Sequence, residues 1–213
     1  MTKIAILHTA NATVAQLNKL IHDQFNDVEI MNWLDDTILP ALIKQAEKYD
    51  YPFEKLLQYA QFAERQGADY IINACSSVGP FKDYAKQRLM TPIIRIDDPV
   101  TDILANKYES IAVIGTIPTT LKPSTDLLKK KNAHLNVNPI LIEGAFELGR
   151  KGYKDEHDKA VIEAVVEALE DNEAVFLAQA SMAEALSLLD SSLQERVYSS
   201  PEYLMNYLHT ILD

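Results

Sequence analysis

Residues 111–124 read IAVIGTIPTTLKPS, an apolar run of strand length that ends in a glycine and a threonine and leads into a proline turn. Residues 3–9, KIAILHT, repeat this form with a strand-like apolar run and a small polar ending. Further runs rich in Ile, Val and aromatic residues predict strands at residues 28–33, 70–74, 93–96, 137–142, 174–178 and 196–198. Intervening segments carry apolar residues three and four apart and predict helices at residues 13–25, 52–66 and 155–170. Strands alternating with helices indicate βαβ units and mainly parallel sheets, so the predicted fold class is α/β.

The two halves of the sequence resemble each other. His8-Thr9 corresponds to Gly115-Thr116, the turn ACSS at residues 74–77 corresponds to QASM at 179–182, and IDDPVTDIL corresponds to YSSPEYLMNYL near the end. A duplication predicts two similar parallel-sheet α/β domains related by a pseudo-two-fold axis. Their expected ranges are residues 1–100 with 201–213, and residues 101–200, with the final helix at 201–212 packing on the first domain. Because α/β folds bind ligands at the carboxyl ends of their strands, we expect the active site in the cleft between the domains.

Composition excludes several classes of protein. Hydrophobic residues make up 47% and charged residues 24%, which is ordinary for a globular chain rather than a disordered one. The net charge of −11 disfavours nucleic acid as a partner. No apolar run approaches the roughly 20 residues of a membrane span, and residues 1–7 lack a signal-peptide cleavage site, so we expect a cytoplasmic protein without membrane attachment. A single cysteine excludes a disulfide framework.

Cys75 is the first candidate for chemistry because it follows an apolar strand and precedes Ser76 and Ser77. Backbone N–H groups at such a strand end favour an anion, and we expect them to lower the pKa of the thiol. The hydroxyls and amides of the two serines are suited to a substrate carboxylate. The structural alternative is a buried cysteine that acts as a small hydrophobe.

Other polar residues also follow predicted strands. Thr116, Thr119 and Thr120 form a loop suited to a carboxylate or phosphate, although the P-loop pattern GxxxxGK[ST] is absent. The structural alternative is a helix cap with Pro118 fixing the turn. Gln179 and Ser181 lie in the turn that mirrors Cys75, and His8 is a candidate general acid or base or a structural histidine. His157 with its neighbouring acids lacks the spacing of a metal site, so no metal is expected.

At these motifs the chain resembles the aspartate/glutamate/hydantoin racemase superfamily. The resemblance rests on KIAILHT, INACSSVG, IAVIGTIPTTLKPS, the strand ending at Glu143, and VFLAQASMA, and it extends over nearly the whole chain. It implies two similar α/β domains, a site in the cleft between them, no cofactor, and a homodimer. It further implies that one cysteine removes the α-proton of a carboxylic substrate while a second returns a proton from the opposite face.

This sequence departs from that pattern because Ala180 stands where the resemblance puts the second cysteine. Either another group such as His8, Ser181 or His157 serves the second face, or the reaction uses one base, as in related decarboxylases, or the cleft binds a small acid without turnover. We expect a racemase or epimerase acting on a small dicarboxylic amino acid such as aspartate or glutamate. The alternatives are a one-base lyase or decarboxylase and a non-catalytic carboxylate-binding protein. The expected catalytic residues are Cys75, His8 and Ser181. The expected substrate-binding residues are Asn73, Ser76, Ser77, Thr116, Thr119, Thr120 and Gln179.

Overall fold

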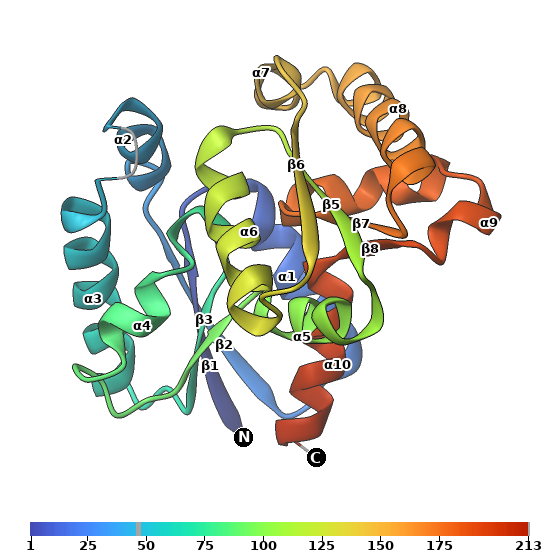
Figure 1. The fold of residues 1–213 in the computed structure, drawn as a ribbon. Helices are drawn as coiled ribbons and strands as arrows, with labels where there is room; N and C mark the ends of the chain where they lie inside the picture. The colour runs from blue at the N-terminus through green and yellow to red at the C-terminus, as the bar shows by residue number, and fades with distance from the viewer. Residues whose placement is uncertain (46–47, 213) are drawn as a thin grey trace. The chain divides into compact units, whose positions relative to one another are not determined.

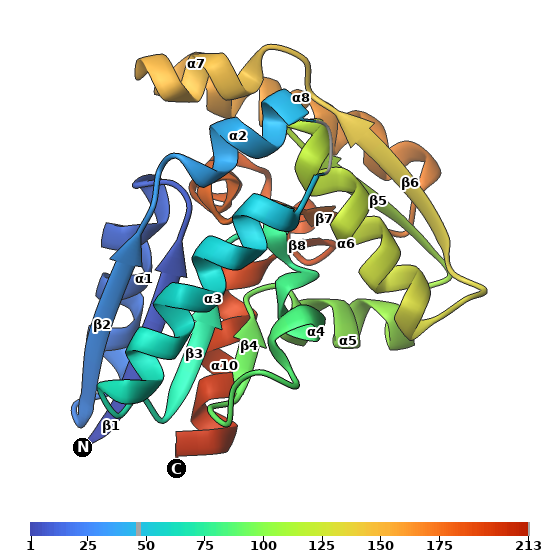
Figure 2. The ribbon, with the colours of Figure 1, turned by 90° about the vertical axis from the view of Figure 1, so that its left-hand side faces the viewer.

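The structure is a computed structural model that describes residues 1–45 and 48–212. Its strands form two four-stranded parallel sheets; Figure 1 labels all of these strands except β4, which Figure 2 labels. The first sheet has the order β2-β1-β3-β4, with β1 Thr2–His8, β2 Val28–Leu34, β3 Tyr70–Asn73 and β4 Ile93–Arg95. The second has the order β6-β5-β7-β8, with β5 Ser110–Gly115, β6 Asn136–Leu141, β7 Ala174–Leu177 and β8 Val197–Ser199. The α/β prediction and all eight predicted strands are confirmed.

The chain divides into two compact units. The first unit comprises Met1–Ile96 and Leu204–Asp213, and the second comprises Asp97–Tyr203. The helices of the first unit are α1 Ala12–Gln24, α2 Ile38–Gln45, α3 Asp50–Arg65, the 3₁₀ turn η1 Ser76–Val78 and α4 Phe81–Ala85. Those of the second are α5 Asp98–Lys107, α6 Pro118–Lys131, α7 Ala145–Lys151, α8 Lys154–Asp171, the 3₁₀ helix η2 Ala180–Leu188 and α9 Ser191–Gln194. The last helix, α10 Ser200–Leu212, begins in the second unit and continues into the first.

The central strands are apolar along their length because helices cover both faces of each sheet. Ile4, Ile6, Ile111 and Val113 are completely buried. In the first unit one face packs on α2, α3 and α4, and Figure 2 shows α3 lying across that sheet. In the second unit α5 and α6 contribute to one core cluster, and α8 and η2 to the other.

The final helix packs within the first unit through its C-terminal part. The rings of Phe25 and His209 lie 4.4 Å apart, and the hydroxyl of Tyr70 donates to the carbonyl of Ile211 at 3.4 Å. These contacts join the C-terminal part of the helix to Phe25 and Tyr70 of the first unit. None of the helices within the described ranges has the length and apolar character that crossing a membrane requires.

The two units repeat one anchoring contact, which supports the duplication. In the first, the carboxylate of Asp69 accepts a hydrogen bond from the N–H of Lys3 at 2.8 Å. In the second, the carboxylate of Glu173 accepts from the N–H groups of Glu109 and Ser110 at 2.6 and 3.2 Å. Each unit thus uses an acidic residue just before its third strand to hold the start of its first strand.

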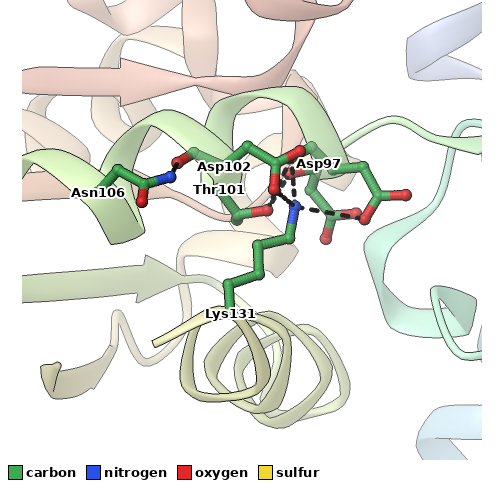
Figure 3. A network of polar contacts seen from close by, with 6 residues as sticks. Asp97, Thr101, Asp102, Asn106 and Lys131 are labelled. Atoms are coloured by element: carbon green, nitrogen blue, oxygen red, sulfur yellow. Dashed lines mark hydrogen bonds and ion pairs between the residues drawn. The ribbon is translucent and has the colours of Figure 1, made fainter. Parts of the chain in front are cut away.

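Helices α5 and α6 are joined by Lys131, whose contacts Figure 3 shows. Its ammonium group donates to the carbonyl of Asp98 at 2.7 Å and to the carboxylate of Asp102 at 2.5 Å. The side-chain oxygen Oδ1 of Asp98 lies 3.7 Å away. This network fixes the end of α6 against the beginning of α5, so the two helices cover one face of the second sheet together.

Candidate active site

Cys75 lies just beyond the carboxyl end of β3, where the chain turns into η1. Its sulfur accepts hydrogen bonds from the hydroxyls of Thr9 and Ser77 and from the N–H groups of Ser77 and Val78. Thr9 follows β1, the strand beside β3, so adjacent strand ends supply these donors. A thiolate at this position would therefore meet preorganised donors on several sides.

Burial raises the pKa of the Cys75 thiol, and the four hydrogen-bond donors act in the opposite direction. The expectation of a lowered thiol pKa is therefore wrong. The physical reason is that η1 spans only Ser76–Val78 and adds little dipole, whereas the surrounding core withdraws the sulfur from water. Because hydrogen bonds to a charged acceptor are stronger than those to a neutral one, the four donors act most strongly on the thiolate that forms when the proton leaves.

Asn73 holds the loop that carries Cys75. Its amide nitrogen donates to the carbonyl of Val78 at 3.0 Å, and its amide oxygen accepts from the N–H of Cys75 at 3.3 Å. The side chain is 1% exposed. These contacts engage Asn73 with the loop itself, and its role in substrate binding stays a prediction. Ser76 and Ser77 are buried in the same turn.

His8 ends β1 in a hydrogen-bonded network of its own. Its Nδ1 lies 2.8 Å from Thr13 Oγ1, and its Nε2 lies 2.9 Å from Asn32 Oδ1. The amide of Asn32 donates in turn to Asn18 Oδ1 at 3.0 Å. Burial lowers the pKa of His8. Both ring nitrogens are thus directed at α1 and β2, and the contacts match the structural alternative for this residue.

The second unit brings Thr116 and Gln179 together at the carboxyl ends of β5 and β7. The side-chain oxygen of Gln179 accepts hydrogen bonds from the N–H of Thr116 at 2.6 Å and from its hydroxyl at 3.0 Å. Because the oxygen is used in this way, the NH₂ group of Gln179 is turned away from Thr116. It is a donor held in a fixed direction.

More hydroxyls gather at the same edge of the second sheet. Thr119 and Thr120 are buried in the first turn of α6, which has no side-chain cap bond. Ser199 and Ser200 are buried where β8 ends. Within the described residues, Ser200 Oγ has no hydrogen-bond partner. In the sequence this stretch stands out only as part of the internal repeat, and its position directly after a strand is the signal that could have marked it as part of a site.

Gln179, and not Ala180, is the counterpart of Cys75 in the second unit. The N–H of Ala74 donates to Leu7 of the first strand, and the N–H of Ala178 donates to Ile114 in the same way. Cys75 and Gln179 come next in their units, and both precede a 3₁₀ helix in extended conformation. The resemblance puts the second cysteine at Ala180, and the hydrogen-bond register places the position equivalent to Cys75 one residue earlier, at Gln179.

Two other expected residues lie apart from these contacts. Ser181 is exposed on η2. His157 is buried and its Nδ1 lies 2.8 Å from the carboxylate of Asp158, which Lys154 also contacts. Across residues 1–45 and 48–212, no group of three or more His, Cys, Asp or Glu side chains is arranged to hold a metal ion.

Comparison with known proteins agrees with this architecture. A family model described as Asp/Glu/Hydantoin racemase matches residues 4–208. The solved glutamate racemase of Francisella tularensis subsp. tularensis SCHU S4, in complex with D-glutamate, is 16% identical with a TM-score of 0.74, covering 99% of this chain and 81% of that one. The aspartate racemase of Picrophilus torridus is 15% identical with a TM-score of 0.72 over 99% and 94% of the chains.

The allantoin racemase of Klebsiella pneumoniae is also similar in structure. It is 16% identical with a TM-score of 0.68, covering 100% of this chain and 88% of that one. At such low identity the likeness to these structures shows a common fold. No curated protein matches the sequence.

Proposed function

Since the chain belongs to the Asp/Glu/hydantoin racemase family, we propose that it abstracts the α-proton of a small carboxylic substrate without a cofactor. The substrate class that we favour is a dicarboxylic amino acid such as aspartate or glutamate. The observation that carries the proposal is the set of donors on the Cys75 sulfur from Thr9, Ser77 and Val78. We also maintain the expectations of a homodimer in the cytoplasm and of two domains.

Cys75 is the proposed base. A Cα–H beside a carboxylate is a very weak acid, so its removal needs a positioned base and donors for the charge that develops on the carboxylate oxygens. When the thiolate takes the proton, the C–H electron pair passes into the carbon–carboxylate bond and gives an enediolate. The thiol then returns its proton to the same carbon. Four donors around the sulfur favour the thiolate that starts this cycle.

We assign carboxylate binding to donors of the second unit. The NH₂ group of Gln179 has a fixed direction because Thr116 holds the amide oxygen. Thr119, Thr120 and Ser200 add buried hydroxyls at the same sheet edge. Neutral donors suit a carboxylate that gains charge during the reaction, because they need little reorganisation in the transition state.

A one-base reaction is the second candidate, and Gln179 favours it. An amide cannot take up or release a proton near neutral pH, whereas a thiol can. With Gln179 at the position equivalent to Cys75, this chain carries only one thiol, and α-proton exchange would proceed on one face of the carbon. His8 and Ser181 remain the predicted alternatives for a second acid or base.

The experiment is α-proton exchange in D₂O, followed by NMR, for both enantiomers of aspartate, glutamate and related acids. Cys75→Ala is the control. Exchange that depends on Cys75 supports the proposal. Chiral chromatography of the product then distinguishes a racemase from a one-base enzyme. Loss of optical purity indicates a racemase with a second base, while retained configuration indicates a one-base enzyme. Substrate-dependent thermal stabilisation without exchange would contradict both and favour a carboxylate-binding protein.

A further inference from the structure

Arg95 is a buried cation at the carboxyl end of β4. It is 6% exposed, and it is the register partner of Asn73 on β3. Asn73 in turn holds the loop of Cys75 through hydrogen bonds to Cys75 and Val78. A buried cation therefore lies on the strand next to the one that leads into the Cys75 loop. In the second unit the equivalent pair of the register is Leu177 and Ser199. The position of Arg95 therefore carries a cation in the unit with the thiol and a neutral serine in the other unit.

The guanidinium group lies against Gly79, directly after η1. A Cβ atom at residue 79 would lie 2.6 Å from Nε of Arg95 and closer still to Cζ and Nη2. Any side chain there would therefore occupy the space of the guanidinium itself. The backbone of Gly79 is ordinary right-handed helical, so glycine is not needed here for its conformational freedom. What glycine provides at this position is room for Arg95.

We propose that Arg95 is a positioning residue for Cys75, and that Gly79 exists to admit its guanidinium group. The contact holds the end of the loop whose Ser77 and Val78 N–H groups donate to the sulfur. Asn73 fixes the beginning and the middle of this loop, and Arg95 fixes its end. Together they keep the donors on the thiol and keep water away from it. The value of this arrangement for catalysis rests on the proposed function, but its test does not.

The test uses Cys75 as its own reporter, because it is the single cysteine of the sequence. Iodoacetamide alkylation is measured against pH for the wild type, Gly79→Ala, Arg95→Met and the double variant. Arg95→Met retains an unbranched stem and removes the planar cation. We expect each single variant to raise the alkylation rate at pH 7.5 at least tenfold. The pH midpoint should fall toward the ordinary thiol value of about 8.5, because burial is the main cause that raises it.

The double variant distinguishes this contact between Arg95 and Gly79, which we call the interlock, from a general destabilisation of the Cys75 loop. If both residues act through one contact, Gly79→Ala should change the rate less than about twofold in the Arg95→Met background. The matched control is Gly149→Ala, which adds a methyl group against His157 in the second unit and should leave Cys75 alkylation unchanged.

Two results would overturn the proposal. One is a folded Gly79→Ala protein with the wild-type rate and midpoint. The other is a double variant whose alkylation rate rises by the product of the increases measured in the two single variants. If Arg95→Met does not fold, the comparison of Gly79→Ala with Gly149→Ala still decides the question. Loss of α-proton exchange plays no part in this test, so the interlock and the proposed reaction can fail independently.

Discussion

Cys75 and Gln179 occupy equivalent positions in the two units. Each follows an alanine whose N–H donates to the first strand of its sheet, and the carbonyl of each accepts an N–H three residues later, from Val78 and Met182. The thiol is held by donors, whereas the amide is itself a donor fixed by Thr116. Equivalent positions of the duplicated fold therefore carry different chemical groups: a thiol suited to proton transfer and an amide suited to binding an oxygen.

Thr9→Val should raise the pKa of the thiol further. The Thr9 hydroxyl stabilises the thiolate, and its loss favours the protonated form. We expect the pH midpoints of alkylation and of α-proton exchange to move upward by about one unit, because a hydrogen bond to a charged group contributes about 1.5 kcal/mol or more. Thr13→Val is the matched control, since Thr13 contacts His8 instead. An unchanged midpoint in Thr9→Val would show that this hydroxyl does not act on the thiolate.

Gln179→Glu should weaken substrate binding while the protein remains stable. A glutamate at this position can still accept both hydrogen bonds from Thr116, but it presents a negative oxygen in place of the NH₂ donor. We expect KM for a carboxylate substrate to rise by about tenfold or more, from one lost hydrogen bond to a charged group. Gln87→Glu makes the same charge change at an exposed site and should leave KM unaltered. Equal KM values for the two variants would contradict carboxylate binding by Gln179.

His8 should make folding stability depend on pH. Burial lowers its pKa in the folded protein, so the unfolded chain binds the proton more readily. The stability from neutral His8 is complete above its unfolded pKa of about 6.5 and declines as pH falls toward the lower folded value. Urea unfolding between pH 5 and 8 should therefore show a smaller loss of stability toward acid in His8→Gln than in the wild type. Parallel pH profiles would rule out this linkage.

Lys131→Met should destabilise the second unit by about 1–2 kcal/mol, because its ammonium group contacts both the backbone and a carboxylate from a partly buried position (Figure 3). Lys129→Met changes an exposed lysine of the same helix and serves as the control. Denaturant midpoints of the two variants give the comparison. If Lys129→Met costs as much, the network in Figure 3 does not carry the effect.

The sequence predicted the strands because buried parallel strands are continuous apolar runs, as at residues 4–7 and 111–114. It did not predict α2 or α7. Helix α2 begins with the run ILPALI, which has no clear helical period, and α7 is a short helix between Gly144 and Gly152, both with positive φ. Tertiary packing, rather than local pattern, places such segments.

Their positions directly after predicted strands identified Cys75, Thr116 and Gln179 as candidates. Their chemistry depends on contacts with residues that are distant in the sequence. Burial of the thiol reversed the expected direction of its pKa shift. The equivalence of Gln179 with Cys75 required the hydrogen-bond register, since one residue of displacement moves it to Ala180. Arg95 was missed because its contact with Gly79 joins residues from a strand and a loop.

The most direct test of Cys75 as the base is α-proton exchange by the wild type and Cys75→Ser, measured side by side on the best substrate at several pH values. Serine preserves the shape of the side chain but is far too weak an acid to form the anion near neutral pH. We predict a rate that rises with pH in the wild type, with its midpoint above the ordinary thiol value, and that falls by about 10² to 10⁴-fold in Cys75→Ser without loss of folding. Turnover by folded Cys75→Ser at the wild-type rate would contradict the account.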